Sequence, residues 1–409
     1  MKIALPCSWD YKFFDYLPEL QKGKNKIYEL YGSLKSSYLG AGHSSAAIRG
    51  DYLKREDVER YVKKVHENGL EFNYTINASC LGNLEFNPRY KAKMLDELEW
   101  ICSFSDTVTV AVPYLIELVK EISRNRVRIA LSTIVGVDSI GKAKRFEELG
   151  VDRIVLNINL NRMPKVVNSI RNHTKIDLEI LVNDSCLKDC PYRYYHYNSG
   201  SHASVHKKAF YLDYCIYNCL NKRLLHVDEI LKSPWLRPED CSNYEGIIDY
   251  MKIGGREKGL DWIIRAAVAY SRGTYNENIL DLLTIISPES HELGELMFNN
   301  KLKFISDNER IEKFFNRFFK DGYECQDCTK CNYCKNHFRE IVYYDDKALV
   351  DYRAKFEVLG RMMDIKKNQN VFKFLLMKYA FNQYVKDTKK WKMMKKHLPY
   401  FKDKIFRGN

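Results

Sequence analysis

The stretch VRIALSTIVGVDSIGKAKRFEELGVDRIVLN, residues 127–157, contains two short apolar runs separated by an amphipathic one. Residues 127–131 and 153–157 are rich in Val, Ile and Leu, which favours β-strands, whereas residues 139–149 have the apolar spacing of a helix. A strand, a helix and a second strand in this order predict a βαβ unit with two parallel strands. We therefore expect an α/β protein.

The same alternation extends over the first two thirds of the chain. Further helices are predicted at residues 55–68, 88–102, 114–124, 163–172 and 260–272. The eight predicted strands are residues 2–5, 27–31, 71–76, 107–112, 127–131, 153–157, 178–182 and 250–253. Eight such units in about 270 residues match the size of a closed barrel. The predicted fold is a TIM-like (β/α)8 barrel with a C-terminal cysteine-rich and helical extension.

Polar side chains follow several of these strands. In a parallel barrel the loops after the strands converge on one face, which forms the binding mouth. The residues predicted to face this mouth are Asn77, Ser132, Thr133, Asn157, Asn159, Asn183, Lys252 and Arg256. The candidate catalytic residues are Asn77, Asn183, Lys252 and Arg256, and the last two carry charges suited to a substrate carboxylate or phosphate. For each single side chain a capping or loop-closing role is the alternative.

A first group of cysteines begins directly after the seventh predicted strand. Its members are Cys186, Cys190, Cys215, Cys219 and Cys241. Thiolates at such short gaps let one loop present several sulfurs to a single iron–sulfur or zinc centre, which a later cysteine completes. Four of these five residues are expected to bind the metal, and the choice between Cys215 and Cys219 is open. Arg193, His196 and His202 are candidates for hydrogen bonds to the metal centre or to an anionic substrate, with loop or capping roles as the alternative for the histidines.

A second group consists of Cys325, Cys328, Cys331 and Cys334, with two residues between consecutive members. This spacing is similar to that of ferredoxin loops, although the fourth cysteine of such a run often serves another cluster. Zinc is the competing occupant. We expect a second metal site here, holding either a 4Fe–4S cluster or Zn.

Composition suggests three parts: a barrel at 1–290, a segment with the second cysteine group at 291–346, and a basic helical tail at 347–409. The tail carries 17 Lys and Arg against 5 Asp and Glu, nearly all of the net charge of +13. RNA or an acidic protein is the expected partner of this tail, and a merely solvated helical face is the alternative. No apolar run approaches a signal peptide or membrane span, so a cytoplasmic protein with reduced cysteines is predicted.

Several motifs resemble those of the peptidase U32 family, the collagenase-like peptidases, over residues 1–290. They are Tyr31-Gly32-Ser33-Leu34 with Gly40-Ala41-Gly42, Tyr74-Thr75-Ile76-Asn77, Leu131-Ser132-Thr133, Leu149-Gly150-Val151-Asp152-Arg153-Ile154-Val155-Leu156, Glu179-Ile180-Leu181-Val182-Asn183 and Met251-Lys252-Ile253-Gly254-Gly255-Arg256. The resemblance implies a barrel with a 4Fe–4S cluster on four cysteines. Carried over to this sequence, the ligands are Cys186, Cys190, either Cys219 or Cys215, and Cys241.

Some members of that family act in oxygen-independent hydroxylation of ubiquinone precursors, transfer RNA or ribosomal RNA. This sequence departs from the common pattern at Asn183-Asp184, Gly254 and Ile158-Asn159, where acid–base groups usually stand. The resemblance therefore implies a divergent branch that performs a hydroxylation-like redox modification on an organic, peptide or macromolecular substrate. It also leaves open a heteromer with a related protein.

Two other functions remain as alternatives. The family name implies a peptidase, although the sequence contains no HExxH motif and no evident Ser, His and Asp order. A non-catalytic metalloprotein that binds RNA through the basic tail is the third hypothesis, and its affinity would fall steeply with salt.

Overall fold

The computed structural model describes residues 1–34, 37–42, 53–205, 214–284, 302–325, 327–328 and 330–362, with side chains up to residue 357. Eight parallel strands form a closed barrel in sequence order, and β8 pairs with β1 to complete it. The predicted (β/α)8 fold is confirmed. The strands are β1 Lys2–Pro6, β2 Lys26–Gly32, β3 Glu71–Ile76, β4 Thr107–Val110, β5 Arg128–Leu131, β6 Arg153–Val155, β7 Asp177–Leu181 and β8 Tyr250–Lys252.

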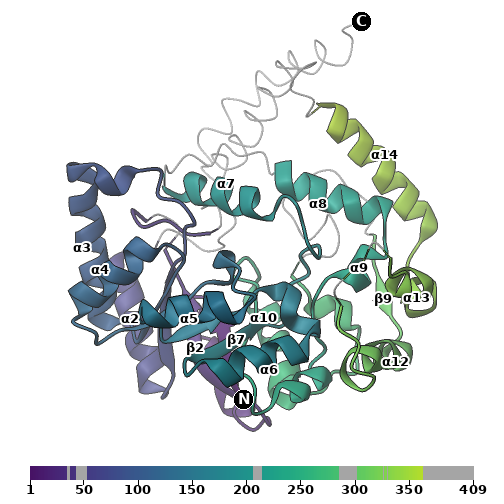
Figure 1. Ribbon diagram of the computed structural model, residues 1–409, viewed down its shortest axis with the longest axis horizontal. Coiled ribbons are helices and arrows are strands. Elements are labelled where there is room, and N and C mark those ends of the chain that lie inside the picture. The colour runs from purple at the N-terminus through teal and green to yellow at the C-terminus, as the bar shows by residue number, and fades with distance from the viewer. Residues whose placement is uncertain are drawn as a thin grey trace, which may run out of the picture.

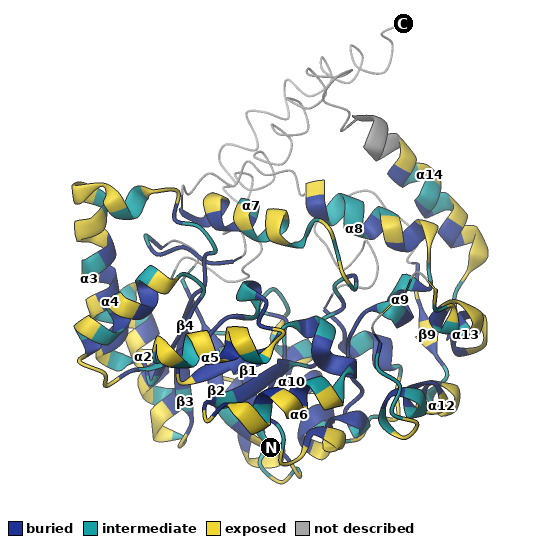
Figure 2. Ribbon diagram, in the orientation of Figure 1, coloured by how far each residue is buried: buried dark blue, intermediate teal, exposed yellow. Residues whose placement is uncertain are grey.

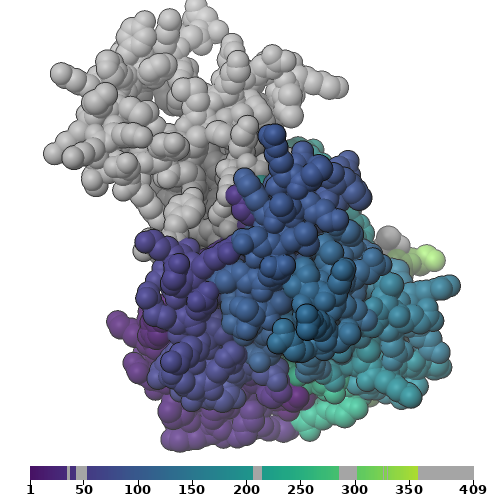
Figure 3. Space-filling model, turned by 90° about the vertical axis from the view of Figure 1, so that its left-hand side faces the viewer, coloured from purple at the N-terminus to yellow at the C-terminus, as the bar shows by residue number. Residues whose placement is uncertain are grey.

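Helices surround the strands (Figure 1) and turn their polar faces to solvent, while the strands are almost entirely buried (Figure 2). The wall consists of α1 Phe13–Leu20, α2 Arg55–Glu67, α3 Pro88–Phe104, α4 Pro113–Ser123, α5 Ile140–Glu148, α6 Pro164–His173 and α10 Leu260–Arg272. Local sequence sets where they begin: Pro occupies the first turn of α3, α4 and α6, and the Ser139 hydroxyl caps α5 by accepting from Lys142 N. In Figure 3 the purple and blue residues of the N-terminal part form one continuous side of this wall.

Short 3-10 helices follow or connect several strands. They are η2 Leu84–Phe86, η3 Thr133–Val135, η4 Ile158–Arg162, η5 Glu239–Tyr244 and η6 Ile279–Leu282. Of these, η3 and η4 come directly after β5 and β6, so they lie at the carboxyl ends of the strands, where a barrel binds its ligands.

The interior of the barrel holds a network of charged side chains. Arg153 on β6 donates to Glu29 on β2 at 2.5 Å and to Glu179 on β7 at 3.4 Å, and its guanidinium lies 4.0 Å from the centre of the Tyr250 ring. Lys252 on β8 completes the network by donating to Glu179 at 3.3 Å. Two carboxylates thus balance two cations in the centre of the fold, as buried charges require.

Two helices that the sequence reading did not predict, α7 Arg193–Val205 and α8 Tyr214–Leu225, form a layer above the barrel strands (Figure 1). The Ser201 hydroxyl on α7 accepts from Ser79 N at 2.8 Å, and the Ser204 hydroxyl accepts from Ala41 N at 2.9 Å. Because Ala41 and Ser79 follow β2 and β3, α7 runs from the loop after β7 across the mouth to its other side. The barrel mouth is therefore covered.

The C-terminal extension packs beside this cover. It contains the antiparallel pair β9 Ile305–Ser306 and β10 Val342–Tyr343, and the helices α12 Asn308–Phe319, α13 Tyr333–Ile341 and α14 Asp346–Met362. The short helix α9 Glu229–Lys232, between α8 and β8, contacts α13. The ring of Phe356 on α14 stacks on Tyr217 of α8 at 5.6 Å. Most of the predicted basic tail, 363–409, lies outside the described residues. Within the described part, no helix is both long and apolar enough to cross a membrane.

Candidate metal centre at the barrel mouth

The loop after β7 carries Cys186 and Cys190 and is held by several hydrogen bonds. Cys186 N donates to the Asp184 carboxylate at 2.9 Å, and the Arg193 guanidinium donates to Leu187 O at 2.6 Å. Asp189 adopts a left-handed φ of 50°, a conformation that Asp tolerates better than most residues. The sequence of the loop thus forms a tight turn that brings both cysteines to the same side.

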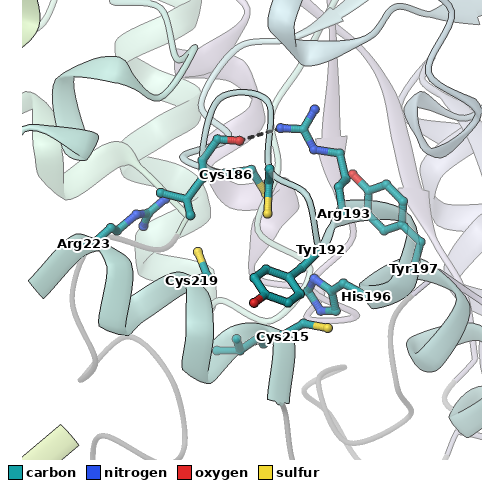
Figure 4. A pocket seen from close by; sticks show the side chains of 11 residues that line it. Cys186, Tyr192, Arg193, His196, Tyr197, Cys215, Cys219 and Arg223 are labelled. Carbon is teal, nitrogen blue, oxygen red and sulfur yellow. Dashed lines mark hydrogen bonds between the residues drawn. The ribbon is translucent and has the colours of Figure 1, made fainter. Parts of the chain in front are cut away.

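A pocket opens between this loop and the helices above the barrel. It is lined by Cys186, Leu187, Cys190, Tyr192, Arg193, His196, Tyr197, Cys215, Ile216, Cys219 and Arg223. In Figure 4 the sulfurs of Cys186, from the β7 loop, and Cys219, from α8, point toward one another. Four of the five candidate cysteines, from two separate segments, therefore line one pocket, and metal binding by them stays a prediction.

Cys215 and Cys219 are four residues apart on α8, so they lie on the same helix face. Burial raises the pKa of Cys186 well above its ordinary value, and Asp184 and Cys219 raise it further. Burial also raises the pKa of Cys190, and Cys219 again adds to the effect. Cys219 thus interacts with both loop cysteines, whereas in Figure 4 the Cys215 sulfur lies nearer His196. The geometry favours Cys219 as the third member of the group.

Arg193, at the start of α7, is one of two arginines that line this pocket. Burial would lower the pKa of its guanidinium, but Cys186, Tyr197 and Asp184 together raise it above the ordinary value. Its Nε is buried and has no hydrogen-bond partner among the described residues. A buried donor of this kind beside thiols is suited to a sulfur or anion in the pocket.

The predicted histidines are placed differently from each other. His196 lines the pocket and stacks on the Tyr197 ring with 6.2 Å between centroids. His202 lies further along α7 on its exposed side and does not line the pocket. Sequence reasoning missed Tyr197 on α7, Arg223 on α8 and Tyr192 in the turn before α7; their only signal was the aromatic and basic composition around the cysteines.

Cys241 does not join the other members of the first group. It lies in η5, before β8, where it is 1% exposed and its Sγ is 3.3 Å from Arg237 O. Its surroundings are part of the core, and its charge would act on the Tyr244 and Tyr270 hydroxyls rather than on the pocket. A cysteine on a long connection after the other four can lie either beside them or in the core of the barrel. The spacing in the sequence does not distinguish these two positions.

The catalytic candidates at the mouth are held by neighbouring groups. The Asn77 amide donates to the Ser132 hydroxyl at 3.0 Å and accepts from Gly42 N at 3.0 Å. Asn183 accepts from Gly254 N at 2.7 Å and donates to Leu282 O at 3.0 Å, so it ties the ends of β7 and β8 together. These contacts match the loop-closing alternative for Asn183, and a catalytic role for either residue stays a prediction.

The two predicted substrate cations differ in position. Lys252 is buried inside the barrel, paired with Glu179 and 4.0 Å from the Tyr31 ring centre. Arg256, after β8, is partly buried and donates to the Ser33 hydroxyl at 3.3 Å. Burial lowers the pKa of Arg256, although Tyr31 and Glu257 oppose the shift. Arg256 is therefore better placed than Lys252 to meet an anionic substrate.

The second cysteine group lies at the edge of the barrel, next to the first. Cys325 and Cys334 are buried, and Cys328 and Cys331 are partly exposed. A hydrogen bond from Cys328 outweighs burial and lowers the pKa of Cys325 to about 6. As the side chains stand, the described residues contain no three Cys, His, Asp or Glu donors close enough to hold one metal ion. None of these cysteines forms a disulfide.

Comparison with known proteins identifies the family to which this chain belongs. The model of peptidase family U32 matches residues 31–188, which end inside the first cysteine loop. An uncharacterized protease of Methanocaldococcus jannaschii is 32% identical over 320 residues, or 77% of this chain and 89% of that protein. The chain belongs to peptidase family U32. The solved U32 peptidase Mk0906 aligns at 20% identity over 61% of this chain and 90% of that one, with a TM-score of 0.45. The resemblance read from the sequence is confirmed.

Proposed function

We propose that this U32 protein binds a 4Fe–4S cluster in the pocket above the barrel and uses it in an oxygen-independent, hydroxylation-like modification of an organic or macromolecular substrate. The observation that carries the proposal is the convergence of Cys186 and Cys190 with Cys219 from a different helix. Cys215, which lines the same pocket, is the candidate fourth ligand.

The donor set fits such a cluster chemically. Thiolates are the ligands of iron–sulfur centres, and none of the four cysteines forms a disulfide. Because burial raises the pKa of Cys186 and Cys190, these thiols need nearby positive charge to ionise, and bound iron supplies it. Arg193 supports the same charge distribution with its unpaired Nε.

When bound, the cluster would supply one-electron redox chemistry. The chain itself would position that substrate. Arg256 and Ser33 lie at the end of β8 and β2, and Asn77 and Ser132 lie at the end of β3 and β5. These groups offer a cation and several neutral hydrogen-bonding atoms at the mouth, while α7 limits access of water from above.

A peptidase is the second candidate, because the relatives that carry a description are a protease and a U32 peptidase. In this alternative the cysteine pocket stabilises the fold, and cleavage takes place at the mouth. The two candidates differ in one measurable respect: peptide cleavage would continue in protein from which iron has been removed.

The test is iron and acid-labile sulfide per chain in anaerobically purified protein, together with visible absorption. Cys186→Ser should abolish the iron of the pocket, because one of the converging ligands is lost. Cys241→Ala is the matched control: it also removes a buried thiol, and we expect the same iron content as in the wild type. Equal iron in wild type and Cys186→Ser would reject the cluster, and peptide cleavage by iron-free protein would favour the peptidase.

A further inference from the structure

A buried arginine lies beneath the second cysteine group. Arg162 ends η4, directly after β6, and is 1% exposed. It donates to Leu231 O at 2.6 Å and to Trp235 O at 3.1 Å. Its guanidinium also lies 4.7 Å from the Phe315 ring centre and 5.3 Å from that of Phe318. The barrel thus holds a cation at this position by carbonyl groups and aromatic rings.

The charge of Arg162 has no ion-paired carboxylate among the described residues. Arg162 and Cys334 share one acceptor: Leu231 O accepts from the Arg162 guanidinium at 2.6 Å and lies 3.9 Å from the Cys334 Sγ. The carboxylate of Asp240 is already paired with Arg237 through bonds of 2.6 and 2.8 Å. The second cysteine group therefore lies next to a buried arginine that no carboxylate of the described residues pairs with.

A second cation approaches from the first cysteine loop. The Lys188 side chain is only 7% exposed and lies within electrostatic range of Cys325 and Cys328. Lys188 lies between Cys186 and Cys190 in the sequence. Those two cysteines line the first pocket, whereas the Lys188 side chain extends toward the second cysteine group. Its partner Asp189 is 3.1 Å away and largely exposed, which weakens that ion pair by solvent screening.

We propose that Cys325, Cys328, Cys331 and Cys334 bind a second, independent metal centre as thiolates, and that Arg162 and Lys188 balance its charge. Four thiolates around either Zn²⁺ or a 4Fe–4S core of charge two leave a net charge of minus two, which two cations neutralise. Binding of Zn²⁺, or of a 4Fe–4S core that already carries a charge of two, releases the thiol protons to solvent and transfers no electrons. Without a bound centre, Arg162 is a buried cation with no ion-paired carboxylate among the described residues, an arrangement that desolvation disfavours.

The aromatic surroundings support this assignment. Cys325 and Cys334 belong to the same buried core cluster as Phe314, Phe315 and Phe318 of α12, and Phe314 stacks on Tyr333 of α13 at 5.0 Å. Apolar surroundings on this side of the group would strengthen the interaction between a metal centre and Arg162, while Cys328 and Cys331 stay partly exposed. The cysteine run itself belongs to the extension, but its counter-charges come from the barrel.

The test is metal analysis of full-length protein, purified anaerobically and reconstituted either with zinc alone or with equal amounts of ferrous and ferric iron together with sulfide. Zinc retained without sulfide identifies a mononuclear site, and iron retained with sulfide identifies a cluster. Cys328→Ser should lose one centre per chain, whereas Cys186→Ser should keep that centre even if the first pocket is empty. Unchanged metal content in Cys328→Ser, in every arm, would overturn the proposal without touching the first site.

Arg162 is tested by a matched set. Arg162→Met should weaken binding of the second metal by about 10–100-fold, the usual effect of losing an outer-shell group, and Arg162→Lys should restore part of it. Arg237→Met is the control, because Arg237 also contacts the Phe315 ring, at 5.5 Å, but pairs with Asp240. If Arg162→Met does not fold, Lys188→Met is used in its place, and the rate at which a chelator removes the metal is measured. Faster loss of the metal than in the wild type supports the counter-charge role. An unchanged rate contradicts it.

Discussion

Two buried arginines at the two ends of the β6–η4 segment meet opposite surroundings. Arg153 and Arg162 are each 1% exposed. Arg153 faces two carboxylates, Glu29 and Glu179, which raise its pKa above the ordinary value although burial opposes them. Arg162 faces carbonyl groups, rings and thiols, and burial lowers its pKa. The first arginine is neutralised by carboxylates of the fold, whereas the second has no ion-paired carboxylate among the described residues.

The different surroundings of Arg153 and Arg162 suggest different roles for the two buried charges. A buried charge that is fully paired within the chain acts in stability, whereas one that lacks an anion indicates a ligand or metal that is still to be added. The barrel network is complete: Glu29 also accepts from Asn73 at 2.9 Å, and Asn73 accepts from Thr109 at 2.8 Å. The barrel interior should therefore respond to mutation through folding, and the Arg162 site through metal binding.

The largest effect is expected from Arg153→Met. Removing this cation leaves Glu29 and Glu179 buried with only Lys252 to balance them, and breaking a buried pair costs about 3–5 kcal/mol. Urea unfolding of the variant against wild type measures the loss. The double variant Glu29→Gln/Arg153→Met should recover part of it, because one buried anion is removed as well. A loss below about 1 kcal/mol would mean that water or relaxation already screens the network.

A smaller loss of folding stability is expected when the pH is lowered. Burial raises the pKa of Glu29, but Arg153 and Lys252 outweigh it and hold the pKa below the ordinary value. A carboxyl of this kind contributes stability that is fully present above its unfolded pKa, about 4.3, and is lost as the pH falls through its folded pKa. Between the two values the loss is about 1.4 kcal/mol per pH unit for one group.

The measurement is the free energy of unfolding from pH 7 downward, for wild type and for Glu29→Gln/Arg153→Met. Other carboxyls titrate in both proteins, so the difference between the two curves isolates the network. The wild type should lose more stability below the unfolded pKa than the double variant does. Parallel curves would show that Glu29 has the same pKa in the folded and unfolded chain.

Much of this architecture is readable in the sequence, and the reasons are physical. Strands such as β4, whose four residues are all buried, appear as continuous apolar or β-branched runs, and short cysteine gaps predict shared pockets. Charged residues inside such runs, Glu29, Arg153 and Glu179, were the available signal for the barrel network. Arg162 had no such signal, because its cage comes from residues far along the chain. The cover helix α7 was missed since its polar and aromatic residues lack a clear apolar face.

The smallest loss of stability is expected when a third arginine, which is exposed, is replaced. This variant is the control for the two buried arginines. Arg145 on α5 is 83% exposed and lies 3.8 Å from Glu148, itself 68% exposed. Solvent and salt screen such a pair, and the side-chain entropy lost in holding it offsets the attraction, so exposed pairs contribute about 0–0.5 kcal/mol. Arg145→Met should leave urea unfolding and metal content unchanged within error. A loss as large as that of Arg153→Met would show that removing any arginine destabilises this protein, and the contrast between paired and unpaired buried charge would lose its basis.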